Sequence, residues 1–172
     1  EEIKRYNVMK KLKKLWKKIK DKGKRKNLSP PFKLSKPLNI GVIGAGIQAS
    51  RLAGQVIDAG AKVVAVHDVK IESAQKLAKL SSSKLSTTNL NEFFEVPMDG
   101  LLLCTIPTVR AEPIKRACDK KIHLLIEKPA AYNLNTGQKC LDYINKSGVI
   151  SSVGFQFRYE PRYDKLKKLI EG

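Results

Sequence analysis

Apolar and polar positions form alternating blocks along residues 38–155. Six of these blocks are short, rich in branched apolar residues and mostly apolar at consecutive positions, which predicts strands. They cover 38–43, 62–67, a short stretch near residue 85, 100–106, 122–126 and 149–155. The blocks between them have apolar residues at helical spacing, which predicts helices at 48–59, 72–80, 109–120 and 135–146 and a helical turn at 91–95.

Strands that are apolar on both faces and alternate with helices indicate a parallel sheet covered by helices on both sides. Pro113 is compatible with the helix at 109–120, because it falls near the first turn, where proline is tolerated. In open parallel sheets, ligands bind beyond the carboxyl ends of the strands. The residues that directly follow each strand are therefore the candidates for function.

Directly after the first strand, residues 44–49 read Gly-Ala-Gly-Ile-Gln-Ala and match the pattern G-x-G-x-x-(G/A). Gly44 allows a tight turn, Gly46 lets a pyrophosphate approach the backbone, and Ala49 keeps the helix close to the strand. The N–H groups at the start of the helix face the phosphates. A glycine turn in an unrelated α/β protein is the alternative. The strand before it and the helix after it favour a dinucleotide site in a Rossmann-type, doubly wound sheet.

The second strand ends in an acid, Asp68, which lies 22 residues beyond Gly46. A carboxylate at this place accepts hydrogen bonds from both hydroxyls of an adenosine ribose, and it repels the 2′-phosphate of NADP. Lys70, two residues further on, favours NADP instead. We expect NAD as the cofactor, with NADP as the alternative.

Glu127, Lys128 and Pro129 follow the predicted strand at 122–126. A lysine at the carboxyl end of a central strand lies at the nicotinamide end of such a site, and the proline fixes the turn. The alternative is a solvated lysine, which is common after a strand.

Several motifs between residues 39 and 172 together resemble the glucose–fructose oxidoreductase/inositol dehydrogenase (Gfo/Idh/MocA) family, in particular its N-terminal dinucleotide-binding domain. They are the glycine motif, the strand ending in Asp68, Thr105-Ile106-Pro107, the segment 121–129 and the segment 153–159. Glu-Lys-Pro and its spacing to the later Gly-Phe-x-x-Arg are fairly specific to this family, whereas the glycine motif is not.

The resemblance implies a dehydrogenase that moves hydride between nicotinamide and a hydroxyl or carbonyl carbon of a sugar, polyol or sugar-nucleotide. Lys128 resembles the family lysine that hydrogen-bonds the reacting oxygen and assists proton transfer. The loop after Pro107 departs from the family, because it reads Thr-Val-Arg where relatives often have Asn and a later His. The resemblance and the glycine motif together assign cofactor contacts to Gly44, Gly46, Ile47, Gln48, Asp68, Thr105, Ile106, Pro107, Glu127, Lys128 and Arg158.

The resemblance also sets the expected domains: a leader and linker at 1–37, the nucleotide-binding domain at 38–157, and the start of a truncated second domain at 158–172. Family members continue into a second α/β domain that supplies substrate contacts and a histidine that works with the lysine. This chain is then inactive as a fragment and oligomeric when complete. A stand-alone nucleotide-binding module without turnover is an alternative. Apolar surface left uncovered predicts self-association.

The net charge of +18, from 34 Lys and Arg against 16 Asp and Glu, is concentrated in the leader. Residues 1–36 hold 15 basic and 3 acidic side chains. The segment 6–20 places Val8, Leu12 and Trp16 on one stripe of a basic helix, and three prolines at 30–37 indicate a linker. A fused-domain remnant is one interpretation. Weak contact of 6–26 with a membrane surface or a polyanion, as in an interaction protein, is the other.

Composition excludes several other classes. Three cysteines without a CxxC pair predict no disulfide framework and no metal site, and they indicate a reducing cytoplasm. No apolar run reaches the length of a membrane span. No nucleic-acid-binding motif accompanies the charge, so no specific nucleic acid is expected. We expect neither His67 nor His123 to be catalytic.

Overall fold

The computed structural model describes residues 34–171, so most of the predicted leader lies outside the described residues. The described residues fall within one unit of the chain, Lys33–Gly172. Their six strands form one sheet in the order β3-β2-β1-β4-β5-β6, and every neighbouring pair is parallel. The strands are β1 Asn39–Ile43, β2 Lys62–His67, β3 Leu85–Thr87, β4 Gly100–Leu103, β5 His123–Ile126 and β6 Ser151–Val153.

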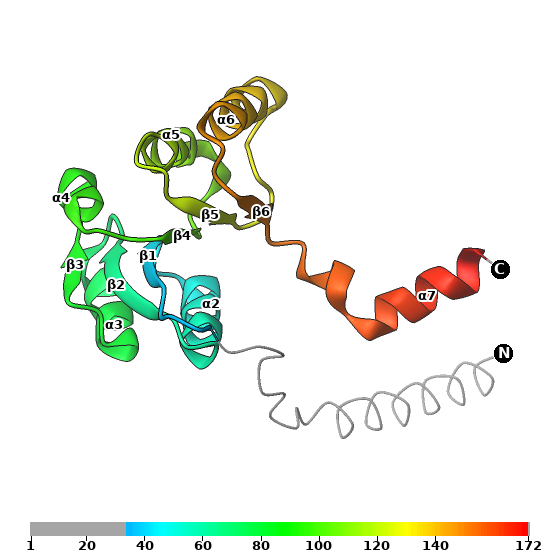
Figure 1. Ribbon diagram of the computed structural model, residues 1–172, viewed down its shortest axis with the longest axis horizontal. Helices are drawn as coiled ribbons and strands as arrows, with labels where there is room; N and C mark the ends of the chain where they lie inside the picture. The colour runs from blue at the N-terminus through cyan, green and yellow to red at the C-terminus, as the bar shows by residue number, and fades with distance from the viewer. Residues whose placement is uncertain (1–33, 172) are drawn as a thin grey trace, which may run out of the picture. The chain divides into compact units, whose positions relative to one another are not determined.

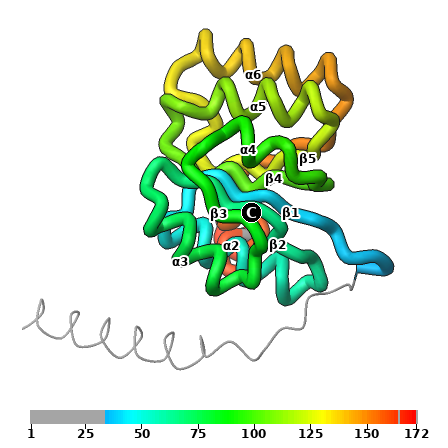
Figure 2. Tube along the Cα trace, turned by 90° about the vertical axis from the view of Figure 1, so that its left-hand side faces the viewer, coloured from blue at the N-terminus to red at the C-terminus, as the bar shows by residue number. Residues whose placement is uncertain are grey.

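Helices cover both faces of this sheet (Figure 1). On one face lie α2 Ile47–Asp58 and α3 Ile71–Ser81, and on the other lie α4 Leu90–Glu95, α5 Ala111–Asp119 and α6 Leu134–Ser147. Figure 2 shows α5 and α6 on one side of β1 and β4, with α2 and α3 on the other. The doubly wound α/β fold predicted from the sequence is confirmed.

The core has two clusters, one on each face of the sheet. Val42 and Val66 pack with alanines of α2 and α3 on one face, whereas Leu101 and Leu103 pack with Phe93 of α4 and with α5 on the other. All four residues of β4 are buried. Burial on both faces is why the central strands have consecutive apolar residues.

Asparagine side chains cap the amino-terminal ends of α4 and α6. The Asn89 side chain accepts hydrogen bonds from the Asn91 and Glu92 N–H groups at the start of α4. At the start of α6, the Asn133 side chain accepts a hydrogen bond from the Thr136 N–H group. Gly148, in a left-handed conformation, caps the other end of this helix. No helix among the described residues is long and apolar enough to cross a membrane.

Two strands are shorter than the sequence predicts. β4 ends at Leu103, because the chain then leaves the sheet and Pro107 opens a 3-10 helix, η1 Pro107–Val109. β6 covers Ser151–Val153 alone, because the Phe155 N–H turns back to the Val153 carbonyl. A second 3-10 helix, η2 Gln156–Tyr159, and helix α7 Pro161–Glu171 follow. Pro113 is the third residue of α5, within the first turn as predicted.

Candidate functional site

A cavity of about 480 Å³ opens at the carboxyl ends of the central strands. The order of the sheet reverses between β1 and β4, since the helices that follow these two strands cover opposite faces. Doubly wound sheets bind their ligands at this switch point. Five predicted residues line the cavity, namely Gly44, Gly46, Asp68, Thr105 and Ile106.

The two glycines of the turn differ in backbone conformation and in the space around them. Gly44 has a φ of +87°, and a Cβ there would lie 2.8 Å from the Cys104 carbonyl carbon and 2.9 Å from the Thr105 nitrogen. The fold itself therefore requires Gly44. Gly46 has a φ of −77°, and a Cβ there would meet no atom within 4 Å. Neither backbone nor packing requires Gly46, so the open space above it is available to a ligand.

The Asp68 carboxylate joins the glycine turn to the turn after β2. One oxygen accepts a hydrogen bond from the Ala45 N–H at 2.7 Å, and the other accepts one from the Lys70 N–H at 2.9 Å. An ionised carboxylate offers about four acceptor positions. These bonds leave one position on each oxygen for the two hydroxyls of a ribose.

The start of α2 lacks the side-chain cap that α4 and α6 have. Gly46 is its N-cap residue, no side chain accepts a hydrogen bond from its first N–H groups, and its first turn holds no acid. The first N–H groups of a helix have no partner within the helix, and the helix dipole makes this end positive. This end of α2 fits an anion such as a pyrophosphate.

Apolar side chains form the part of the cavity beside Asp68. Val69 and Leu90 contribute from one side, and Ile106, Val109 and Pro113 from the other. A slot of this kind beside a ribose-binding carboxylate fits a flat base such as adenine. Ile106 was predicted from the sequence as a cofactor contact. The other four residues were not predicted, because no motif connects them.

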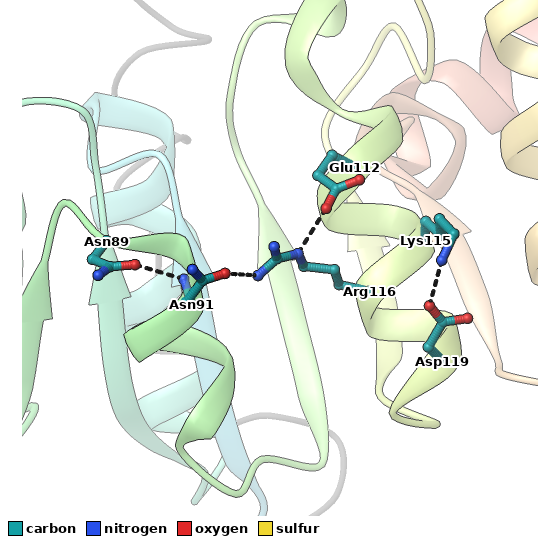
Figure 3. Close-up of polar contacts among 6 residues, drawn as sticks. All are labelled: Asn89, Asn91, Glu112, Lys115, Arg116 and Asp119. Atoms are coloured by element: carbon teal, nitrogen blue, oxygen red, sulfur yellow. Dashed lines mark hydrogen bonds and ion pairs between the residues drawn. The ribbon is translucent and has the colours of Figure 1, made fainter.

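Polar contacts hold α4 against α5 near this slot (Figure 3). Arg116 of α5 donates to Asn91 of α4 at 2.7 Å and to Glu112 one turn earlier, also at 2.7 Å. Lys115 pairs with Asp119 in the same helix. Partly exposed ion pairs of this kind contribute little to stability. The hydrogen bond from Arg116 to Asn91 is the contact of this group that joins α5 to α4.

Glu127 and Lys128 lie at the end of β5, on the other side of the switch point. The Glu127 side chain is buried, and its carboxylate accepts hydrogen bonds from the Gln48 amide at 2.9 Å and from the Lys128 N–H at 3.1 Å. Gln48 and Glu127 line a second, smaller cavity of about 200 Å³. Lys128 is exposed, and the peptide bond that joins it to Pro129 is cis.

Arg110 has one of the most deeply buried side chains of the domain, at 2% exposure. Its guanidinium group donates hydrogen bonds to the Thr105, Glu127 and Pro129 carbonyl oxygens. Burial lowers its pKa from the usual value. The sequence gave no sign that the Arg110 side chain points inward.

Three further residues, Thr105, His67 and Cys104, place polar or titratable groups at the cavity wall. The Thr105 hydroxyl is buried without a hydrogen-bond partner among the described residues. His67 is half-buried, its Nε2 lies 3.2 Å from the Thr88 carbonyl oxygen, and burial lowers its pKa. Burial, reinforced by the nearby Glu127 carboxylate, raises the pKa of the Cys104 thiol to about 12. Cys104 is therefore a neutral wall residue and not a nucleophile.

The remaining predicted residues lie at the margin of the site. Ile47 is exposed at the start of α2, and Pro107 begins η1. Arg158 is exposed in η2 and lines neither of the two cavities described above. His123 lies at the opposite end of β5, where its Nδ1 accepts a hydrogen bond from the Ile150 N–H.

A wider hollow of about 1020 Å³ lies at the amino-terminal end of the sheet, beside Asn39, Lys62 and Val63. Parallel sheets bind ligands at the other end. Size alone does not make this hollow the functional site, because the convergent polar groups gather around the smaller cavity.

The sheet order, the glycine turn and the carboxylate after β2 define a dinucleotide-binding domain. Residues 38–155 match the family described as "Oxidoreductase family, NAD-binding Rossmann fold", GFO_IDH_MocA. The chain belongs to this family. The described domain is therefore the NAD-binding domain of an oxidoreductase family, which confirms the sequence prediction of its fold, family and cofactor type.

Individual relatives extend well beyond the residues they share with this chain. This chain is 28% identical over 141 residues to the uncharacterized oxidoreductase YrbE of Bacillus subtilis. The match covers 80% of this chain and 41% of YrbE. This chain is 30% identical over 132 residues to glucose-6-phosphate 3-dehydrogenase of the same organism. The match covers 76% of this chain and 37% of that enzyme. The chain thus spans about two fifths of the length of these relatives.

The fold also matches solved structures. The WlbA dehydrogenase from Bordetella pertussis, in complex with NADH and UDP-GlcNAcA, superposes with a TM-score of 0.73 at 21% identity. The match covers 83% of this chain and 41% of WlbA. At this identity the likeness establishes the fold alone.

Proposed function

We propose that this chain is the cofactor-binding half of an NAD-dependent dehydrogenase that acts on a hydroxyl or carbonyl carbon of a sugar, polyol or sugar-nucleotide. Gly46 is the observation that carries the proposal. Its conformation is open to any residue and its Cβ position is empty, so the pyrophosphate of a dinucleotide is what excludes a side chain there. The unpartnered Thr105 hydroxyl and the free acceptor positions of Asp68 fit the same ligand.

Lys128 is the proposed catalytic residue. Its side chain is exposed at the end of β5, next to Glu127, whose buried carboxylate fixes the Lys128 backbone. The nicotinamide of a bound cofactor supplies or takes up the hydride. In the reduction direction, the Lys128 ammonium group would donate a hydrogen bond that polarises the carbonyl and then give its proton to the oxygen. In the oxidation direction, the neutral Lys128 amine would accept the hydroxyl proton, and the resulting ammonium group would stay bonded to the oxygen.

NAD is the proposed cofactor, in preference to NADP. The Asp68 carboxylate is held in place by two backbone N–H groups, so it cannot move aside for a 2′-phosphate without breaking both bonds. The Lys70 backbone is one of these two donors, and its exposed side chain is the feature that favours NADP.

In this proposal, the described domain needs a second domain for activity. The exposed Leu169 and Ile170 of α7, at 73% and 75%, fit a helix that begins the second domain at 158–172 and packs against its continuation. That domain would supply the substrate contacts, so the 172-residue chain is proposed to be inactive alone. A homo-oligomeric state of the complete protein stays a prediction. The location in the cytoplasm rests on the three free cysteines. Contact of residues 6–26 with a membrane surface or polyanion stays a prediction, because these residues lie outside the described ones.

The proposal is tested by calorimetric titration of the chain and of two glycine variants with NADH. The chain should bind NADH, and Gly46→Ala should weaken binding about tenfold or more, because its methyl group occupies the space of the pyrophosphate. Gly54→Ala, in the middle of α2, is the matched control. Its Cβ also meets nothing within 4 Å, and alanine there favours the helix.

The outcomes separate cleanly. Gly54→Ala should bind NADH as the unmodified chain does and should keep the unfolding midpoint or raise it. Gly46→Ala should lower the midpoint only slightly, because alanine is a poorer N-cap residue than glycine. No NADH binding by the unmodified chain would refute the proposal. Equal NADH affinities for all three proteins would show that Gly46 does not lie at the cofactor site.

A further inference from the structure

Arg110 connects the two loops that flank the proposed nicotinamide end of the site. Nε and Nη2 both donate to the Thr105 carbonyl oxygen, the first at 3.1 Å. Nη1 donates to the Glu127 and Pro129 carbonyl oxygens, one on either side of Lys128. One buried side chain thus holds the loop after β4 and both neighbours of the proposed catalytic lysine.

The partners of Arg110 are unusual for a buried charge. Among the salt bridges of the described residues, none includes Arg110, so no carboxylate forms an ion pair with it. Burial of a cation without such a partner is costly, and burial lowers the pKa of this guanidinium. Four of the five guanidinium N–H groups are satisfied by carbonyl oxygens. The cost is offset only where all of these bonds form together.

The shape of the guanidinium group explains why arginine serves here. Its planar fork points donors in fixed directions, and each of its two ends reaches a different loop. A lysine carries a single ammonium group with three donors on one nitrogen, so it cannot reach carbonyl groups on both sides of the planar fork. The contact is therefore specific for arginine and not only for a positive charge.

We propose that Arg110 is a positioning residue that locks the Lys128 turn against the Thr105 loop and so forms the nicotinamide half of the cofactor site. This inference rests on the proposed function. The ribose contact of the adenosine half is built without Arg110, because Asp68 is held by the Ala45 and Lys70 N–H groups. Ile106 of the apolar slot follows Thr105 in the loop that Arg110 holds, so a smaller effect is expected on the adenosine half. Arg110 therefore acts mainly on the nicotinamide half of the cofactor site.

The test compares two ligands on the Arg110→Lys variant of the chain. NADH probes the whole site, whereas ADP-ribose probes the half without nicotinamide. We expect Arg110→Lys to bind NADH about tenfold more weakly and ADP-ribose within about twofold of the unmodified chain, in line with the loss of buried hydrogen bonds at one end alone. Arg162→Lys, an exposed arginine of α7, is the matched control and should change neither affinity.

Each outcome decides the inference. Equal weakening of both ligands would show a general structural role and overturn it, and so would unchanged NADH binding. Failure of the unmodified chain to bind either ligand would refute the proposed function instead. Binding of ADP-ribose but not NADH by the unmodified chain would refute the nicotinamide site and this inference with it.

A measurement on the unmodified chain covers the case in which Arg110→Lys does not fold. Hydrogen exchange followed by NMR should show the Arg110 guanidinium N–H groups protected in the free protein, because they are buried and bonded to carbonyl oxygens of both loops before any ligand binds. Exchange of these groups at the rate of those of exposed Arg51 would overturn the inference.

Discussion

The Gln48 side-chain amide donates a hydrogen bond to the Glu127 carboxylate across 2.9 Å and 79 positions of sequence. Gln48 lies in the first turn of α2, just after the glycine turn, and Glu127 directly follows β5. The same carboxylate accepts the Lys128 N–H. The proposed phosphate end and the proposed catalytic lysine are thus joined through one buried carboxylate.

This bond should show strong coupling in a double-mutant cycle of Gln48→Ala and Glu127→Gln. Glu127 is 6% exposed, so its carboxylate depends on its protein partners, and a hydrogen bond to a buried charge contributes about 1.5–3 kcal/mol. We expect an interaction energy of about 1.5 kcal/mol from urea unfolding of the four proteins.

The Gln138 and Asp142 side chains provide the matched control for this cycle. They form the same amide-to-carboxylate bond at 3.0 Å on the exposed face of α6. Solvent competes for that bond, so Gln138→Ala and Asp142→Asn should couple by less than about 0.5 kcal/mol. Equal coupling in the two pairs would contradict a special role for the Glu127 contact.

Gly44→Ala should destabilise the fold with or without ligand. The left-handed φ of +87° costs an L-residue about 1–2 kcal/mol, and the overlap of the new Cβ with the Cys104 and Thr105 backbone adds to it. We expect a loss of about 3 kcal/mol in the free energy of unfolding. Gly60→Ala separates the two causes, because Gly60 has a φ of +96° but nothing within 4 Å of its Cβ position. A loss as large in Gly60→Ala as in Gly44→Ala would show that the backbone conformation alone matters.

Local patterns in the sequence predicted the fold and named five residues that the structure brings together at one cavity. Gly44, Gly46 and Asp68 stand in fixed relation to strand ends, and strands buried on both faces leave consecutive apolar residues that are easy to recognise. Hydrogen bonding at the strand ends was harder to predict, so β4 and β6 came out shorter than expected.

Arg110 could not be found in this way, because all of its partners are backbone carbonyl groups. Every residue has a carbonyl group, so contacts to Thr105, Glu127 and Pro129 leave no trace in residue type. The apolar slot was missed for a related reason. Val69, Leu90 and the pair Val109 and Pro113 belong to three segments that only the folded sheet brings together.

Asp68→Ser should shift the cofactor preference from NADH toward NADPH. The substitution removes the charge that repels a 2′-phosphate and shortens the acceptor for the ribose hydroxyls. We expect NADH binding to weaken about tenfold and NADPH binding to hold or improve, measured by titration with both. Lys70→Ser is the companion variant and should move the preference toward NADH. An unchanged ratio of NADH to NADPH affinity in Asp68→Ser would contradict this prediction. It would show that Asp68 only stabilises the turn, through its bonds to the Ala45 and Lys70 N–H groups.

His67 should make the stability of the fold depend on pH in a defined window. Burial lowers its pKa below the model-peptide value of 6.5, so the unfolded chain binds a proton more readily than the folded one. Stability from this group is complete above pH 6.5 and is lost as the pH falls through 6.5 toward the lower folded pKa. We expect the urea midpoint to fall between pH 7.5 and about 5.5, above the range in which carboxylates titrate.

Substitution of the histidine itself is the control for this pH dependence. His67→Gln should remove the slope in this window, because glutamine does not titrate. A ligand in the cavity should steepen the slope, since it covers His67 further and raises the cost of the imidazolium. A slope that survives in His67→Gln would assign the pH dependence to another group.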